Sequence, residues 1–175
     1  MRVLHVFGAM DVGGAEMRTL ELMDALRDHD VAFDFLTLSG REGSLSDRIS
    51  GLGGRIYPLA ITPAFPLRLF ILLRRTRPAV VDSHVATFSG IIVMVALAAR
   101  VPRRIAHFRS DGDGHTDSLR RKAQRALMTI MIRLAATDIV GVSPGSLALG
   151  YRSAWARDPR ARVVANGIAA SQNMP

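Results

Sequence analysis

Short apolar segments of strand length alternate with longer segments of helical periodicity, and this alternation restricts the folds open to the chain. The strand segments are bounded by glycine, proline or polar residues and cover residues 3–7, 31–38, 55–59, 79–83, 103–108, 138–142 and 162–165. The helical segments between them cover residues 15–27, 45–52, 66–76, 87–100, 117–136 and 144–153. The pattern predicts an α/β fold with a doubly wound, mostly parallel, Rossmann-like sheet and helices on both faces.

The length of 175 residues suits one domain, which we assign to residues 1–168, with 169–175 as a tail or the start of a linker. The absence of cysteine excludes disulfides and thiolate metal sites and fits a cytoplasmic protein. The net charge of +8 comes almost entirely from scattered arginines, and aromatic residues are few, so we expect no nucleic-acid partner. The apolar stretch 85–99 is shorter than the roughly 20 residues of a membrane-spanning helix and predicts a buried helix.

The loop after the first strand reads GAMDVGGAE and is the first candidate for ligand contact, because ligands of doubly wound sheets bind beyond the carboxyl ends of the strands. Gly13 and Gly14 allow close backbone approach, and the amides that begin the next helix favour a phosphate. A tight turn without a ligand is the alternative interpretation. The spacing differs from G-x-G-x-x-G, and no acidic residue clearly ends the second strand, so NAD is disfavoured.

Four segments together resemble one known family. RVLHVFGAMDVGGAEMRTLELMDAL is similar to the opening of the retaining GT-B glycosyltransferases of glycosyltransferase family 4, in which a G-G-A-E/Q turn follows the first strand. VVDSHVATFSG, RRIAHFRSDGDG and ATDIVGVSPGSLALGYRSAWARDPRARVVANGI resemble later segments of that family, in the same order. The resemblance spans nearly the whole chain and implies the N-terminal, acceptor-binding domain of such an enzyme.

The resemblance also implies roles for particular residues. Gly13 and Gly14 would donate backbone N–H groups to the departing diphosphate, where preorganised donors stabilise the developing charge. Glu16 has the alternative role of stabilising the N-terminus of its helix. The residues that we expect on the acceptor side of the cleft are Asp11, Glu16, Ser110, Asp111 and Ser143.

Two further residues are candidate catalytic groups. His84 matches the second histidine of the family's V-V-H-x-H segment, in which Asp82 replaces the first, and we expect His84 to face the cleft; a structural role is the alternative. Arg109 stands where many members have a histidine, and would stabilise phosphate charge, bind an acidic acceptor or pair with Asp111. His107, two residues earlier, is expected to be packed or to support its neighbours.

The loop SDGDGHTD at 110–117 also permits a metal interpretation, because its acidic residues alternate as in calcium loops. No glutamate completes such a loop, however, and its sixth position is not glycine. Asp111 and Asp113 also form a D-x-D pair, the metal-binding signature of the GT-A glycosyltransferases, so a metal-dependent GT-A enzyme is the third hypothesis. The alternative is a loop in which Asp117 caps the next helix. We expect neither a metal nor a cofactor.

The family resemblance also implies a second, donor-binding domain with two glutamates eight positions apart. The only glutamates here are Glu16, Glu21 and Glu42, and Ala169 stands where the family has aspartate. We therefore expect the acceptor-binding half of a retaining, hexosyltransferase-type enzyme that is inactive alone, with a nucleotide-sugar as substrate and a sugar or lipid-linked acceptor. A non-enzymatic Rossmann-like binding or membrane-docking module is the alternative.

Two stretches mix apolar and basic residues in a way that suits the surface of an anionic membrane. They are residues 65–77, with four arginines, and residues 120–125, with three arginines and the only lysine. The other interpretation is that each is the charged solvent face of an ordinary core helix. The first interpretation predicts peripheral contact with the inner face of the cytoplasmic membrane.

Overall fold

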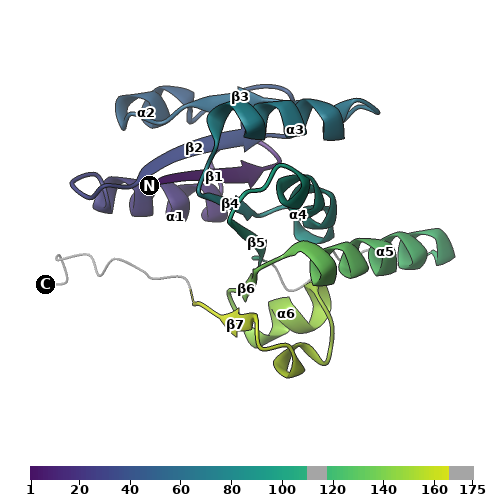
Figure 1. Ribbon diagram of the computed structural model, residues 1–175. Helices are drawn as coiled ribbons and strands as arrows, with labels where there is room; N and C mark the ends of the chain where they lie inside the picture. Colours follow the sequence, from purple (N-terminus) through teal and green to yellow (C-terminus); the bar gives the residue numbers. More distant parts are fainter. Residues whose placement is uncertain (110–117, 166–175) are drawn as a thin grey trace, which may run out of the picture.

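The computed structural model describes residues 1–109 and 118–165, which form one sheet with helices on both faces (Figure 1). The strands lie in the order β3-β2-β1-β4-β5-β6-β7, and every neighbouring pair is parallel. They are β1 (Arg2–Phe7), β2 (Ala32–Thr37), β3 (Ile56–Pro58), β4 (Val80–Ser83), β5 (Arg103–Phe108), β6 (Asp138–Gly141) and β7 (Ala161–Val163). The outermost strands, β3 and β7, have three residues each. The predicted doubly wound parallel fold is confirmed.

Helices follow the strands as the sequence pattern predicts. They are α1 (Gly14–Ala25), α2 (Ser46–Gly51), α3 (Phe65–Thr76), α4 (Ser89–Ala98), α5 (Leu119–Ala135) and α6 (Pro144–Gly150), with short 3-10 helices η1 (Ala86–Phe88) and η2 (Trp155–Arg157). Helix α4 contacts both α3 and α5, so these three helices form one layer. None of the helices within residues 1–109 and 118–165 is both long and apolar enough to cross a membrane.

The alternation of side chains along the central strands creates a core on each face of the sheet. In β1, Leu4 and Val6 belong to the core that includes Leu69 of α3. Val3 and Phe7 point to the other face and pack in the core that includes residues of α1 and α2. Because successive residues of a strand point to opposite faces, continuously apolar strands bury both sides of a parallel sheet.

The starts of α2 and α5 lie later than their predicted segments. Leu45, the first residue of the predicted segment 45–52, occupies the N-cap position of α2 without a side-chain bond, and the Ser44 amide donates to Asp11 Oδ1 at 2.9 Å. Helix α5 is capped by Ser118, whose Oγ accepts from the Arg121 amide at 3.4 Å, and the predicted cap, Asp117, lies outside the described residues. Sequence patterns place helices better than caps, because several neighbouring polar residues compete for one N-cap position.

Close approach of α4 and α5 depends on Gly90. A β-carbon built at Gly90 would lie 2.5 Å from the backbone oxygen of Met128. We expect Gly90→Ala to destabilise the fold by about 2 kcal/mol, because the clash exceeds the gain in helix propensity. Gly51→Ala is the matched control, since no atom lies within 4 Å of its added methyl, and it is expected to be neutral or stabilising. Urea denaturation monitored by circular dichroism measures both; equal stabilities for the two variants would contradict the assigned packing.

Candidate functional site

The candidate site lies where the strand order reverses between β1 and β4. The loops that follow β1, β4 and β5 leave the same end of the sheet, and these strands are neighbours. Chain connections on either side of such a switch point diverge and leave a crevice beyond the strand ends. The glycine turn, His84 and Arg109 follow these three strands in turn, so the predicted site residues are brought together.

The glycine turn forms the beginning of α1. Gly13 is the N-cap residue with extended backbone (φ −156°, ψ 164°), and Gly14 is the first helical residue. A β-carbon at Gly13 would lie 2.4 Å from Glu16 Oε2, whereas one at Gly14 would have open space around it. The Glu16 carboxylate thus folds back over the turn, beside backbone amides that lack partners within the helix.

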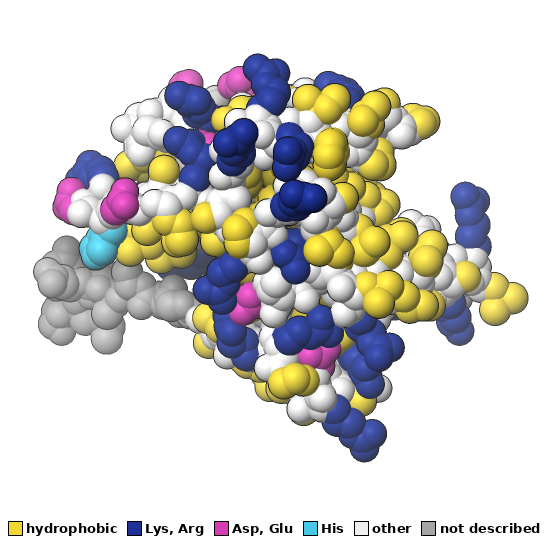
Figure 2. All heavy atoms as spheres, in the orientation of Figure 1, with side chains coloured by type: hydrophobic (Ala, Val, Ile, Leu, Met, Phe, Trp, Pro, Cys, Tyr) yellow, Lys and Arg dark blue, Asp and Glu magenta, His cyan; other side chains and the backbone are white. Residues whose placement is uncertain are grey.

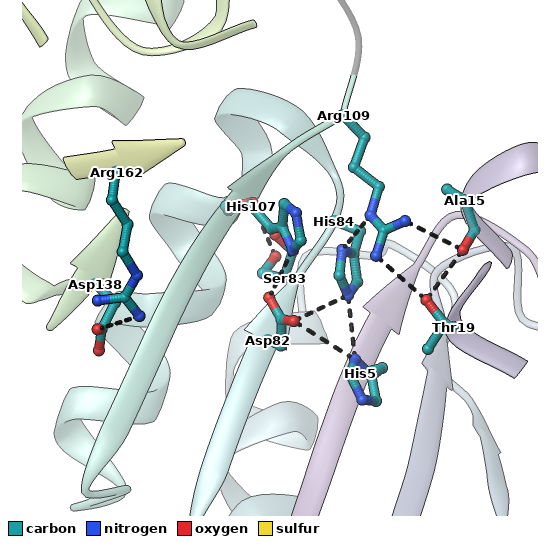
Figure 3. Close-up of polar contacts among 11 residues, drawn as sticks. His5, Ala15, Thr19, Asp82, Ser83, His84, His107, Arg109, Asp138 and Arg162 are labelled. Atoms are coloured by element: carbon teal, nitrogen blue, oxygen red, sulfur yellow. Dashed lines mark hydrogen bonds and ion pairs between the residues drawn. The ribbon is translucent and has the colours of Figure 1, made fainter. Parts of the chain in front are cut away.

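Arg109 joins the end of β5 to the first turns of α1 (Figure 3). Its Nε donates to His84 Nδ1 at 3.1 Å. Its two terminal nitrogens donate to the Ala15 carbonyl and to Thr19 Oγ1, each at 3.3 Å. The guanidinium is therefore held beside the glycine turn at all three of its nitrogens.

The charge of Arg109 has no directly paired carboxylate among residues 1–109 and 118–165. Burial lowers its pKa, and the negative charges of Asp82 and Glu16 act in the opposite direction. A partly buried cation whose three contacts are all to neutral groups is under-compensated, which makes its surroundings attractive to an anion. Arg109 supplies that anion-attracting charge at the edge of the crevice.

His84 lies beneath Arg109 and does not face the open cleft, so the predicted orientation is wrong. Its side chain is 1% exposed and stacks on Phe7 with ring centroids 4.4 Å apart. Burial places the pKa of His84 well below its ordinary value, and Asp82 only partly opposes this effect. His84 is therefore a neutral imidazole under the arginine.

Below His84 lies a polar cluster that the sequence pattern did not predict. Asp82 Oδ2 is 3.3 Å from His84 Nε2 and 3.7 Å from His5 Nδ1, and Asp82 Oδ1 is 3.5 Å from His107 Nδ1. Burial alone would raise the pKa of Asp82, but its contacts with His84, His107 and His5 hold the pKa below the ordinary range. The cluster is an aspartate surrounded by imidazoles, with His107 in the supporting place expected for it.

His5 is the residue that sequence reasoning missed, and two signals could have found it. It has the same parity in β1 as Val3 and Phe7, so it must share their face of the sheet. The parallel register then sets it opposite Asp82. One potential ligand atom from each of His5, Asp82 and His84 lies within 4.8 Å of the others, so these atoms are close enough to share one cation.

The remaining predicted residues have other partners or lie outside the described chain. Asp11 pairs with Arg41 and accepts from the Ser44 amide; the bond from Arg41 is the main cause of its lowered pKa. Ser143 caps α6 by accepting from the Ser146 amide at 2.9 Å. The predictions for Ser110, Asp111 and Asp113 fall outside the described residues.

Most of the chain matches a known protein family. Residues 13–167 match the family described as "Glycosyl transferase 4-like domain".

The chain belongs to this glycosyltransferase family.

Two bacterial relatives share about a third of their aligned residues with this domain. The "Capsular polysaccharide biosynthesis glycosyltransferase CapH" of Staphylococcus aureus is 34% identical over 145 residues, covering 82% of the chain and 41% of CapH. The "Putative glycosyltransferase EpsF" of Bacillus subtilis is 34% identical over 115 residues, covering 61% of the chain and 29% of EpsF. The glycosyltransferase domain thus spans less than half the length of these relatives.

Solved structures show the same fold in one part of larger glycosyltransferases. Anabaena Alr3699/HepE, solved in complex with UDP, aligns with a TM-score of 0.69 at 15% identity, covering 96% of this chain and 44% of HepE. A glycosyltransferase from Rickettsia africae aligns with a TM-score of 0.66 at 14% identity, covering 95% of this chain and 43% of the Rickettsia protein. The GT-B architecture of these neighbours makes the GT-A hypothesis wrong for the fold.

The buried histidines make the glycosyltransferase domain sensitive to acid. Burial lowers the pKa of His5 from 6.5 to about 4, more than Asp82 raises it. The His5 side chain therefore stays neutral in the folded state under conditions in which the same side chain binds a proton in the unfolded chain. The resulting stability is fully present above pH 6.5 and is lost as the pH falls towards 4, by about 3 kcal/mol for His5 alone.

Urea denaturation across this pH range measures the effect. His5→Leu is expected to flatten the dependence, whereas His29→Gln, which alters an exposed histidine, should leave it unchanged. A wild-type stability that stays constant between pH 6.5 and 4 would show that His5 is not held neutral.

Proposed function

We propose that this domain is the acceptor-binding half of a retaining glycosyltransferase, and that it contributes Arg109 and the glycine turn to binding the diphosphate of a nucleotide-sugar. The observation that carries the proposal is the partly buried Arg109 guanidinium, which lies beside the start of α1 without a directly paired carboxylate in the described chain. A diphosphate supplies the charge that this site lacks.

The proposed chemistry follows from where charge develops. When the sugar leaves its nucleotide, negative charge accumulates on the departing diphosphate. The guanidinium and the amides at the start of α1 are already oriented before that happens, so little reorganisation is needed in the transition state. Glu16 covers the turn in the structure, and its carboxylate would have to move aside for an anion to reach Gly13 and Gly14.

Known relatives support the classes of substrate. HepE was solved with UDP, and in another structure with UDP and glucose. CapH is described as acting in capsular polysaccharide biosynthesis. By analogy, the complete enzyme transfers a hexose from a nucleotide-sugar to a hydroxyl of a saccharide or lipid-linked acceptor of the cell envelope, and it needs no cofactor. The acceptor would bind beside the crevice, a second domain would hold most of the nucleotide, and this domain alone would be inactive.

Substitutions at Arg109 and Gly14 test the diphosphate proposal. Arg109→Gln is expected to weaken UDP binding at least about tenfold, because a charge-assisted hydrogen bond is lost. Gly14→Ala is expected to weaken binding while leaving the free energy of unfolding unchanged or slightly raised, since the methyl meets no protein atom. Isothermal titration calorimetry with UDP and urea denaturation measure the two quantities.

Arg74→Gln provides the control for a change of one positive charge, because Arg74 is exposed on α3. It should reduce UDP affinity far less than Arg109→Gln does. If the two arginine variants bind UDP equally well, the diphosphate site is not where we place it.

The surface of α3 supports a second proposal, peripheral contact with an anionic membrane. Leu67 and Ile71, four residues apart, are 63% and 47% exposed. Exposed arginines accompany them on the same helix, at positions 68, 74 and 75. Figure 2 shows hydrophobic side chains gathered over α3 and α5 with lysine and arginine side chains beside them. Such a surface inserts apolar side chains between acyl chains while its cations contact anionic headgroups.

Vesicle co-sedimentation tests this surface. The double substitution Leu67→Ser and Ile71→Ser is expected to weaken binding to phosphatidylglycerol vesicles at least about tenfold, and phosphatidylcholine vesicles should bind the wild type poorly. Leu22→Ser removes a comparably exposed leucine from α1 and is the matched control. Equal sedimentation of the double variant and the control would show that α3 is not the membrane contact.

A further inference from the structure

The contact between Arg109 and His84 determines where the proton of the imidazole lies. Arginine nitrogens only donate, so Arg109 Nε, at 3.1 Å, requires a lone pair on His84 Nδ1. An imidazole that keeps a lone pair on Nδ1 is not an imidazolium, and in its neutral form it carries its hydrogen on Nε2. The burial of His84 agrees with the neutral form.

The hydrogen on His84 Nε2 has two neighbouring acceptors. His5 Nδ1 is the hydrogen-bond partner of this nitrogen at 3.1 Å, and Asp82 Oδ2 lies 3.3 Å away at ion-pair distance. The carboxylate is the stronger acceptor of the two and attracts the same N–H group. The three side chains therefore lie in a directed chain: Arg109 donates to His84, and the N–H group of His84 lies against the Asp82 carboxylate.

We propose that Asp82 and His84 are positioning residues that hold the Arg109 guanidinium in its phosphate-facing place. The inference rests on the proposed function of Arg109 as a diphosphate-binding group. Asp82 fixes the tautomer of His84, and this tautomer is the only neutral one that accepts a hydrogen bond from Arg109. A buried carboxylate that orients an imidazole for a third group is an established physical arrangement in other proteins.

The same geometry argues against a cation shared by His5, Asp82 and His84. A metal ligated by His84 Nε2 would take the lone pair that a hydrogen occupies in the described arrangement. Metal-bound histidines usually donate their second ring N–H to a carboxylate or carbonyl. Here the second nitrogen accepts from a cation instead, so the Arg109 contact and metal ligation at His84 are incompatible without forming an imidazolate.

A positioning role of Asp82 and a purely electrostatic role predict opposite changes in anion affinity when the Asp82 charge is removed. If Asp82 acted only through its charge, removing that charge would make the site more positive and strengthen anion binding. If Asp82 acts by fixing His84, the same substitution frees Arg109 to leave its place and weakens anion binding. The direction of the change in affinity therefore separates the two roles.

Nitrogen-15 NMR of the histidine side chains tests the first step on the wild-type protein. We expect His84 at neutral pH to show a protonated Nε2 and an unprotonated Nδ1, with the signal assigned by comparison with His84→Gln. In Asp82→Asn the signal is expected to shift towards a mixture of tautomers. A wild-type His84 with its hydrogen on Nδ1, or one whose Nε2 signal is replaced by a zinc-bound form when stoichiometric Zn²⁺ is added, would overturn the proposal.

Calorimetric titration with inorganic pyrophosphate tests the second step. Asp82→Asn is expected to weaken pyrophosphate binding about tenfold, in the same direction as Arg109→Gln. Asp138→Asn is the matched control, because Asp138 is also a buried strand carboxylate but lies at the amino end of β6 and pairs with Arg103 and Arg162. Unchanged or tighter pyrophosphate binding by Asp82→Asn would show that Asp82 does not position Arg109.

The two measurements separate failure of this inference from failure of the proposed function. Wild-type protein that binds no pyrophosphate yet shows the expected His84 tautomer would refute the phosphate role of Arg109 and leave its anchoring intact. Pyrophosphate binding that depends on Arg109 and not on Asp82 would refute the inference alone. If Asp82→Asn does not fold, the wild-type tautomer still decides whether the directed chain exists.

Discussion

The register of β1, β4 and β5 decides where every charged group of the site lies. These neighbouring parallel strands place His5 opposite Asp82 and bring the loops after β4 and β5 to one end of the sheet. Side-chain alternation then puts His5, Asp82 and His107 on the face covered by α1, while Leu4 and Val81 fill the other core. A slip of one residue in β4 would turn Asp82 to the other face of the sheet and bury its carboxylate among leucines.

The sequence was sufficient for the fold because the segments are short, apolar and separated by clear breaks. The residues of the site were harder to place. His84 stands at a strand end, which suggested exposure, but Arg109 from the next strand covers it and Phe7 stacks on it. His5 carries no motif and becomes visible only when strand parity is combined with the pairing of β1 and β4. Such contacts join residues 79 or 25 positions apart in the chain, which periodicity within one segment does not report.

Two departures from the family pattern become one feature in the structure. The resemblance marks Asp82 and Arg109 as separate exceptions, each standing where the family usually has histidine. In three dimensions they are the negative and positive ends of a chain through His84. Each charge would be costly if buried without the other. Three buried polar atoms of the described cluster, His5 Nε2, Asp82 Oδ1 and His107 Nε2, have no hydrogen-bond partner, which shows that the arrangement is not optimised for stability alone.

The length of the outer strands has a consequence for the behaviour of the protein at high concentration. The two lateral borders of the sheet are β3 and β7, and each has only three residues. Pro58 ends β3 and has no amide hydrogen to offer to an incoming strand. A sheet whose borders present so few unpaired peptide groups is a poor template for edge-to-edge aggregation. The hydrophobic central strands are thus shielded from other copies of the chain, even though they are continuous enough to fill two cores.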